Sequence, residues 1–251
     1  MVCGSTQGIG KAAAIELALL GATVTLIARN EDELKKVCAE LPKTFSQKHD
    51  YVRADFSKPD ELKAEVEKYV AGKTIHILIN NTGGPKGGPI SEAKLEEFLD
   101  TFNRHLVCNH ILVQAVLDGM KKEKYGRIIN IISTSVKQPI KGLGVSNTIR
   151  AAVASWAKTL AGEVARYGIT VNNILPGSTE TQRQRSLFEI KAEREKKSYE
   201  EIKVEALSEI PMARFASPEE VANAIAFLAS PAASYITGIN LPVDGGRTGS
   251  L

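Results

Sequence analysis

The residue pattern with the clearest chemical meaning is the stretch CGSTQGIG at residues 3–10. Its three glycines, Gly4, Gly8 and Gly10, are spaced as G-x-x-x-G-x-G. Glycines at this spacing let the backbone turn sharply and bring its N–H groups close to a phosphate. An alanine- and leucine-rich helix is predicted directly afterwards, over residues 11–20, and its positive N-terminal end would face the same phosphate. The stretch therefore predicts a phosphate-binding turn.

A glycine motif alone is weak evidence for nucleotide binding, and the segment that follows it strengthens this evidence. The apolar run TVTLI at residues 23–27 predicts a second strand after the interval that a βαβ nucleotide-binding unit needs. We therefore expect the chain to bind a dinucleotide. Only three residues precede Gly4, so either the first strand is very short or residues upstream of it are missing.

Strand-like and helix-like segments alternate along the rest of the chain. Strands are predicted at residues 51–54, 75–79, 127–132, 170–175 and 239–243, and helices at 30–41, 58–70, 95–120, 148–166 and 219–228. Continuous apolar strands separated by helices are typical of a parallel sheet that is covered on both faces. The fold class predicted is α/β: a single Rossmann domain over residues 1–251, with a doubly wound parallel sheet of about seven strands.

Between residues 182 and 206 the chain becomes densely charged with mixed sign, which predicts a solvated pair of helices. The segment follows Pro176-Gly177, at the carboxyl end of a predicted strand, where ligands bind in such sheets. Residues 182–210 are therefore a candidate substrate lid.

Composition excludes several classes of protein. The chain has 251 residues and a net charge of +3, with 32 basic and 29 acidic residues interspersed, so no basic field for nucleic acid or membrane is expected. The three cysteines, Cys3, Cys38 and Cys108, are scattered, which argues against disulfides and a metal site. No signal peptide or membrane-spanning run is present, and we expect a cytoplasmic protein.

The end of the second strand indicates which dinucleotide binds. In a βαβ unit an acidic residue there accepts hydrogen bonds from the free 2′-hydroxyl of the ribose, whereas an arginine binds a 2′-phosphate. Here the strand ends with Ile27-Ala28-Arg29. Glu31 and Asp32 come later and have an ordinary place in the first turn of a helix that Asn30 would cap. The sequence therefore favours NADP(H) over NAD(H), although a plain surface arginine is the alternative at Arg29.

Taken together, these motifs resemble the short-chain dehydrogenase/reductase family over nearly the whole chain. The resemblance depends on the glycine turn, Asp55, the run Asn80-Asn81-Thr82-Gly83, Ser133, Pro176-Gly177 with Thr181, and the closing run at residues 241–246. The stretches at residues 218–222 and 235–238 are similar to the members called 3-oxoacyl-carrier-protein reductases.

The resemblance implies cofactor contacts along the whole cleft. The implied residues are Gly4, Ser5, Thr6, Gln7, Gly8, Ile9 and Gly10 at the phosphates, Arg29, Asp55 and Phe56 at the adenosine, Asn81, Thr82 and Gly83 beneath its ribose, and Pro176, Gly177, Thr179 and Thr181 at the nicotinamide. Considered alone, Asp55 has the alternative of capping a helix, and the paired asparagines that of forming a turn.

The catalytic residues depart from the family pattern of a tyrosine, a lysine four residues later, a serine and an asparagine. Alignment places Ser146 at the tyrosine, Arg150 at the lysine and His105 at the asparagine, and only Ser133, thirteen residues before Ser146, is retained. The run Ser135-Val136-Lys137-Gln138-Pro139-Ile140, followed by Ser146-Asn147 and Arg150, resembles a divergent reductase-like branch that lacks the Tyr-x-x-x-Lys pair. In that branch, proton donation by this tyrosine is absent as a rule.

These replacements change the acid chemistry. An aliphatic hydroxyl is a far weaker acid than a phenol, and an arginine stays protonated. Arg150 would hold ribose hydroxyls and stabilise a developing alkoxide, and Ser146 would bind the carbonyl or position a water. His105 either supplies protons or is simply a buried residue of its helix. Tyr199 is the one tyrosine that could swing in from the lid, and Lys86 is a weaker candidate for contacting an anionic substrate.

Two functions follow as hypotheses. The first is an NADP(H)-dependent oxidoreductase that reduces a small-molecule carbonyl, such as a 3-oxoacyl thioester or a small ketone. The alternative is a protein that binds NADP(H) without turnover, as a sensor or as the inactive partner of a relative. The family resemblance also implies a homotetramer, or a homodimer, built from the long helices around His105 and after Arg150.

Overall fold

The computed structural model describes residues 1–250 of the chain and contains one sheet of seven parallel strands. The strands lie in the order β3-β2-β1-β4-β5-β6-β7, so the order reverses between β1 and β4. Their bounds are β1 (Val2–Cys3), β2 (Thr25–Ala28), β3 (Asp50–Arg53), β4 (Ile77–Asn80), β5 (Gly126–Ile131), β6 (Ile169–Pro176) and β7 (Asn240–Val243). The predicted α/β fold with a parallel sheet of seven strands is confirmed.

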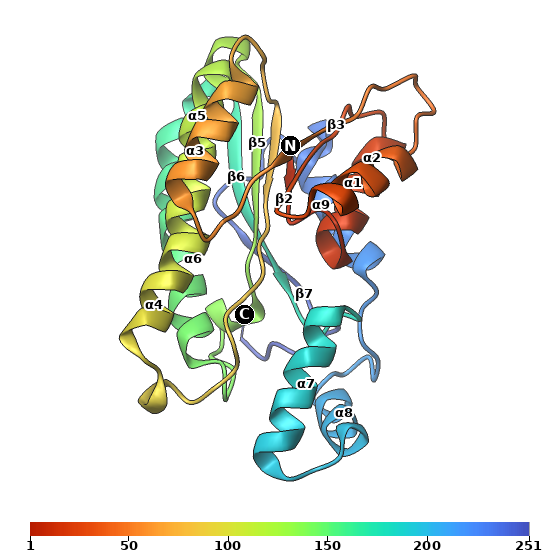
Figure 1. Cartoon of the computed structure of the whole chain (residues 1–251), viewed down its shortest axis with the longest axis vertical. Coiled ribbons are helices and arrows are strands. Elements are labelled where there is room, and N and C mark those ends of the chain that lie inside the picture. Colours follow the sequence, from red (N-terminus) through yellow and green to blue (C-terminus); the bar gives the residue numbers. More distant parts are fainter. Residues whose placement is uncertain (251) are drawn as a thin grey trace.

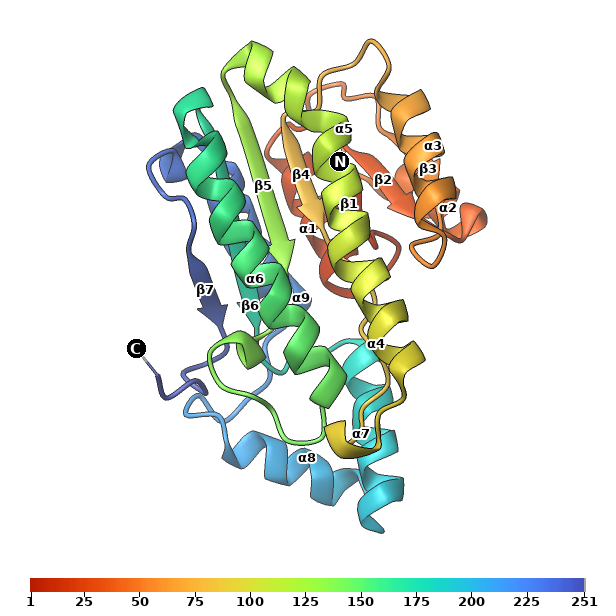
Figure 2. The same ribbon diagram turned by 90° about the vertical axis from the view of Figure 1, so that its left-hand side faces the viewer.

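Helices cover both faces of this sheet, as the predicted doubly wound fold requires. In Figure 1, α3, α5 and α6 lie on one side of the strands, and α1, α2 and α9 lie on the other. Figure 2 shows α5 and α6 in front of the strands, running along them. The bounds are α1 (Gly8–Leu19), α2 (Glu31–Glu40), α3 (Pro59–Val70), α4 (Leu95–Phe102), α5 (Cys108–Glu123), α6 (Gly144–Val164), α7 (Gln182–Glu195), α8 (Tyr199–Ser208) and α9 (Pro218–Ala229).

Two differences from the sequence prediction bear on the site. Helix α1 begins at Gly8 rather than after the glycine motif, so the last turn of the motif is already helical. The helix expected over residues 95–120 is interrupted by a π-helical turn at Asn103–Val107, which holds His105. Single π turns within α-helices are frequent at functional sites, because the extra residue re-aims the side chains around it.

Apolar residues that are neighbours along a strand pack on opposite faces of the sheet. Leu26 and Ile79 belong to the core beneath α1 and α9, whereas Ile27 and Leu78 belong to the core beneath α3, α5 and α6. This alternation explains why the strands are apolar throughout: both faces of each strand are buried. The first strand has only two residues, and the Met1 amino group extends its contacts by donating a hydrogen bond to the Ile77 carbonyl at 2.8 Å.

A row of asparagines crosses the sheet on four neighbouring strands. Asn80, Asn130, Asn173 and Asn240 stand at matching positions on β4, β5, β6 and β7. Each of the first three donates its side-chain amide to the Oδ1 of the next, at 2.9, 2.8 and 2.8 Å. Buried amides are costly unless they are paired, so a register shift in any of these strands would break hydrogen bonds of this row. The row therefore fixes the register of these four strands relative to one another.

Candidate active site

The carboxyl ends of the strands surround a cleft of about 920 Å³, which we call the main cleft. Loops that leave parallel strands on either side of a reversal in strand order separate there and leave space for a ligand. Most of the residues predicted from the sequence line it: Gly4, Thr6, Gln7, Gly8, Ile9, Arg29, Asp55, Phe56, Asn81, Thr82, Gly83, Ser133, Ser146, Arg150, Pro176, Gly177, Thr179 and Thr181.

The glycine turn has the geometry that its sequence predicted. Gly4 and Gly8 have φ of +57° and +52°, a region that side chains other than glycine rarely adopt. A Cβ on Gly10 would lie 2.1 Å from the Gly4 carbonyl oxygen, so the start of α1 packs directly against the turn. No side chain caps α1, and its first turn has no acidic residue. The free N–H groups and the positive helix end therefore fit a phosphate.

Ser5 and Gly10 do not line the main cleft. Ser5 is buried, and its hydroxyl donates to the Ile27 carbonyl, so its side chain anchors the turn to β2. Gly10 provides the close approach between helix and turn. The Asn81 amide donates to the carbonyls of Cys3 and Gly4, both at 3.3 Å, and ties the turn to the end of β4.

The adenosine end of the main cleft carries an arginine that forms no ion pair within 4.0 Å among the described residues. Arg29 directly follows β2 and is exposed. Asn30 caps α2 by accepting from the backbone N–H groups of Asp32 and Glu33, as predicted. The Glu31 carboxylate forms an ion pair with Lys35, with 2.9 Å between Oε1 and Nζ. A cation without a carboxylate bound to it is therefore available at this end of the main cleft.

Asp55 closes a turn and lines the main cleft, but it does not cap α3, whose N-cap residue is Lys58. Its Oδ1 accepts hydrogen bonds from the backbone N–H and the hydroxyl of Ser57, at 2.9 and 2.8 Å, which closes the turn before α3. These bonds lower the pKa of the carboxyl, so it is ionised at neutral pH. The residue also lines the main cleft beside Phe56.

Ser133, Ser146 and Arg150 lie at the opposite end of the main cleft. The Ser133 hydroxyl accepts from the N–H of Ser135, so its own proton is available to a ligand. Ser146 is in the first turn of α6, and Arg150 lies one turn further along the same helix. The Arg150 guanidinium donates to the Ile131 carbonyl at 2.7 Å, at the end of β5. Burial and the nearby Arg183 lower the pKa of Arg150 to about 10, so it remains a cation at neutral pH.

His105 is buried, with 3% of its surface exposed, and it does not line the main cleft. Burial first, and the positive charge of Arg150 second, hold its pKa well below the ordinary value of 6.5, although a hydrogen bond with the Gly83 backbone opposes them. The ring is therefore neutral at neutral pH, and its Nε2 is buried without a hydrogen-bond partner among the described residues. This environment favours the view of His105 as a buried residue of its helix over that of a proton donor.

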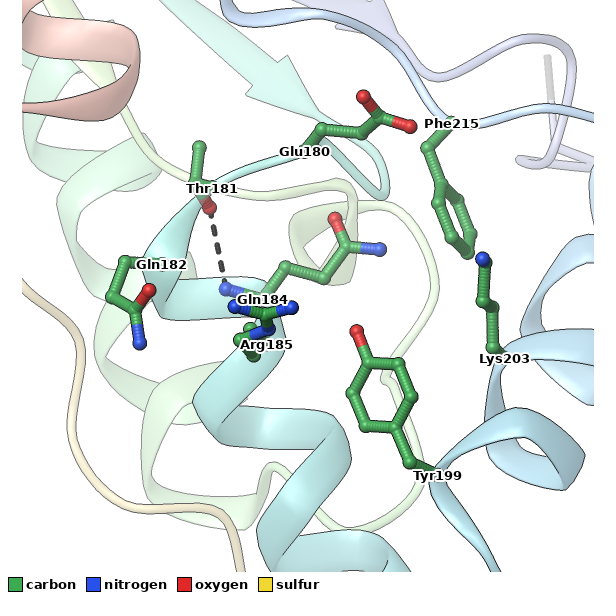
Figure 3. A pocket seen from close by; sticks show the side chains of 8 residues that line it. All are labelled: Glu180, Thr181, Gln182, Gln184, Arg185, Tyr199, Lys203 and Phe215. Carbon is green, nitrogen blue, oxygen red and sulfur yellow. Dashed lines mark hydrogen bonds between the residues drawn. The ribbon is translucent and has the colours of Figure 1, made fainter.

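The other titratable residues considered for this site lie outside the main cleft. Neither Lys86 nor Tyr199 lines it. Figure 3 shows Tyr199 in a smaller pocket of about 350 Å³ between α7 and α8, beside Phe215 and Arg185. The Tyr199 ring packs against Phe188, 6.0 Å between centroids. The charged segment does form two helices, α7 and α8, which extend beyond the strand ends in Figure 1.

Sequence reasoning missed Arg183 as a functional candidate. It falls within the charged segment at residues 182–206, and in the structure it lines the main cleft and donates to the Pro85 carbonyl. Its position two residues after Thr181, at the start of the segment that follows β6, was the signal that could have identified it. Thr181 itself lies against the glycine turn, 3.2 Å from where a Cβ on Gly8 would be.

Within residues 1–250, no helix combines the length and the apolar character needed to cross a bilayer. Over the same residues, no group of three or more histidine, cysteine, aspartate or glutamate side chains is arranged to hold a metal ion.

Comparison with known proteins finds similarity over nearly the whole chain. The family model described as "Enoyl-(Acyl carrier protein) reductase" matches residues 4–248. The 3-oxoacyl-[acyl-carrier-protein] reductase FabG of Aquifex aeolicus is 34% identical over 247 residues, which cover 98% of this chain and 95% of that protein. The crystal structure of YwfH, an NADPH-dependent reductase involved in bacilysin biosynthesis, has a TM-score of 0.93 and 30% identity, covering 100% of this chain and 98% of that one. A single-substitution variant of the actinorhodin polyketide ketoreductase, in a crystal structure with NADPH, has a TM-score of 0.92 and 32% identity, with 99% and 96% covered.

Proposed function

This chain belongs to the short-chain dehydrogenase/reductase family, and on that premise we propose that it reduces a carbonyl group with NADPH. The observation that supports this most directly is that one cleft joins an intact glycine turn to Ser133, Ser146 and Arg150. A 3-oxoacyl thioester or a small ketone is the substrate that we propose. When it is bound, NADPH supplies the hydride that reduces the carbonyl carbon.

Different residues of the chain bind different parts of the cofactor. The N–H groups at the start of α1 bind the pyrophosphate, and Arg29 binds the 2′-phosphate. Asp55 and Phe56 contact the adenine, and residues 81–83 lie beneath its ribose. At the other end, Arg150 holds the hydroxyls of the nicotinamide ribose, and residues 176–181 contact the nicotinamide.

The chain stabilises the charge that develops on the carbonyl oxygen. The hydroxyls of Ser133 and Ser146 donate hydrogen bonds to this oxygen, and the Arg150 cation and the positive N-terminal end of α6 lower the energy of the alkoxide. No phenol lies among the described residues of the main cleft, so a water that Ser133 and Ser146 position delivers the proton. The product is the alcohol, and the water that gave the proton is restored from solvent.

The alternative of a binding protein without turnover is less well supported. The FabG of Aquifex aeolicus and YwfH, which match over nearly the full chain, are both named as reductases. The replacement of tyrosine and lysine by Ser146 and Arg150 still leaves hydrogen-bond donors and a cation in the main cleft.

Spectrophotometry tests the proposed function. Purified protein is mixed with NADPH and a panel of oxoacyl thioesters, diketones and quinones, and the absorbance of the reduced nicotinamide is followed. Oxidation of NADPH by one class of carbonyl supports the proposal, whereas tight NADPH binding with no oxidation across the panel supports the inactive alternative. The double variant Ser146→Tyr/Arg150→Lys restores the residues of the family pattern and tests whether the rest of the main cleft is competent.

We also propose a cytoplasmic homotetramer, with residues 182–210 as the substrate lid of a single NADP-binding domain. Three apolar side chains on one side of α4 support assembly: Leu95, Leu99 and Phe102 are 77%, 65% and 39% exposed. Sedimentation velocity measures the oligomeric state, and a monomer at micromolar concentration would contradict it.

A further inference from the structure

Two arginine side chains from different helices meet at one point of the main cleft. A Cβ on Gly84 would lie 3.5 Å from Nη2 of Arg150 and 3.1 Å from Nη2 of Arg183. Arg150 comes from α6 and Arg183 from the first turn of α7, and both side chains end beside the loop that follows β4. The two guanidinium groups are therefore close neighbours with the same charge.

The protein provides no carboxylate to balance this pair. Among residues 1–250, neither Arg150 nor Arg183 has an acidic oxygen within 4.0 Å. Each makes one hydrogen bond to a backbone carbonyl, that of Ile131 or of Pro85, although a guanidinium has five N–H donors. The pKa of Arg183 is lowered by burial, and that of Arg150 by burial and by Arg183, as expected for cations held together without an anion.

The other arginines and the carboxylates of the main cleft do have partners. Three of its arginines have acidic partners: Arg104 pairs with Asp100, Arg194 with Glu195 and Arg247 with Glu209. The carboxylates that line it are also engaged, since Asp55 bonds Ser57, Glu195 and Glu205 contact Lys197, and Glu209 contacts Arg247. Only Arg29, Arg150 and Arg183 remain without an acid among the described arginines of the main cleft.

The position of the pair separates it from the phosphates of the cofactor. Arg29 follows β2 and the glycine turn follows β1, whereas Arg150 and Arg183 meet beyond β4 and β5. The proposed function already accounts for the phosphates through Arg29 and the start of α1. The pair also lies beside the proposed reaction centre, because Ser146 is one turn before Arg150 on α6. An anion bound there would lie beside the proposed reaction centre rather than at the phosphates of the cofactor.

We propose that Arg150 and Arg183 bind a carboxylate of the substrate, so that the substrate is a small oxo acid. This inference rests on the proposed function and selects, from the carbonyl compounds considered there, those with a carboxylate near the carbonyl. A guanidinium has five N–H donors, so Arg150 can hold the ribose hydroxyls assigned to it above and still donate to the carboxylate, while Arg183 binds the carboxylate through paired hydrogen bonds. The carboxylate is unchanged by the reaction, and its role is to orient the carbonyl toward Ser133 and Ser146.

Calorimetry on the protein saturated with NADP⁺ tests this proposal without requiring turnover. The probes are pyruvate, acetoacetate and levulinate, which place the carboxylate at increasing distance from the carbonyl, and the methyl ester of each. At least one acid is expected to bind about tenfold or more tightly than its ester, since charge-assisted hydrogen bonds are lost in the ester. Equal binding of acid and ester in all three pairs would overturn the proposal.

Variants of α7 test whether Arg183 is responsible for the tighter binding of the acid than of its ester. Arg183→Met is expected to reduce the acid-over-ester ratio to within about twofold, and Arg183→Lys, which keeps the charge but loses the fork, to retain part of it. Arg185→Met is the matched control, because this arginine of the same helix lines the smaller pocket of Figure 3 and should leave the ratio unchanged. An unchanged ratio in Arg183→Met, with NADP⁺ affinity retained as the sign of correct folding, would overturn the proposal.

Phosphate binding and NADPH oxidation distinguish a failure of the carboxylate assignment from a failure of the proposed reductase activity. If inorganic phosphate binds the NADP⁺-loaded protein more tightly than every oxo acid, and does so only with Arg183 present, the anion is a phosphate and the carboxylate assignment is wrong. If the acids bind in an Arg183-dependent manner but NADPH is not oxidised by any of them, the carboxylate site stands and the proposed reductase activity fails. Oxidation of NADPH by the methyl esters alone would support the reductase activity and overturn the oxo acid.

Discussion

The close contact between Gly10 and Gly4 can be tested by substituting Gly10, which shows whether the phosphate site depends on this contact. In Gly10→Ala the new Cβ would stand 2.1 Å from the Gly4 carbonyl oxygen and 2.8 Å from Nδ2 of Asn81, whereas ordinary contacts begin at 3.4 Å. The Gly4 oxygen is backbone and cannot rotate away. Forcing an extra methyl into such a site costs about 3 kcal/mol, at the upper end of the range for overpacking. The alanine recovers up to about 1 kcal/mol through helix propensity.

The net expectation is a loss of about 2 kcal/mol in the free energy of unfolding, which corresponds to a fall in Tm of about 4–8 °C for a chain of this size. Because the clash separates α1 from the turn that would hold the pyrophosphate, we also expect NADPH to bind at least about tenfold more weakly. Differential scanning calorimetry measures the first effect, and quenching or transfer of protein fluorescence by NADPH measures the second.

Gly162→Ala is the matched control for this variant. Gly162 also lies in a helix, α6, and a Cβ there would have no described atom within 4 Å outside its own stretch of helix. The same substitution should therefore stabilise the protein by up to about 1 kcal/mol and leave NADPH affinity unchanged. If Gly10→Ala keeps both its Tm and its NADPH affinity, the close approach of helix and turn is not what holds the phosphate site.

The remaining predictions concern the cofactor, the catalytic residues and His105. Arg29→Ala should weaken NADPH binding by about tenfold or more and NADH binding by less than about twofold, and equal losses in fluorescence titrations would contradict the cofactor assignment. Ser133→Ala and Arg150→Ala should each lower kcat/KM for a carbonyl substrate by about tenfold or more, because each removes a group that stabilises the alkoxide; unchanged rates would remove both from the site. His105 is neutral when folded and takes up a proton on unfolding below pH 6.5, so stability should fall as the pH decreases from about 7 to 5. His105→Asn should flatten this slope in urea titrations by up to about 1.4 kcal/mol per pH unit, and an identical slope would show that the histidine is not buried in its neutral form.

Many features of this protein follow from short stretches of sequence. The glycine spacing requires left-handed backbone at Gly4 and Gly8, and the structure has it there. Short apolar strands between helices permit little besides a parallel sheet with two covered faces. The cation at Arg29 and the cap at Asn30 depend on residues within one turn of a strand end, so local pattern is sufficient to predict them.

The remaining features depend on contacts between distant parts of the chain. The asparagine row needs the register of four strands, and the burial of His105 depends on how its π turn packs beneath the loop at Gly83. For the same reason, the sequence could not predict that Arg150 and Arg183 meet beside Gly84. The sequence by itself determined the fold class and the kind of cofactor, because these are set by local backbone preference and by residues close in the chain. Only the tertiary structure decided which charges face one another in the main cleft, because distance and burial, rather than residue type, determine whether a cation is paired.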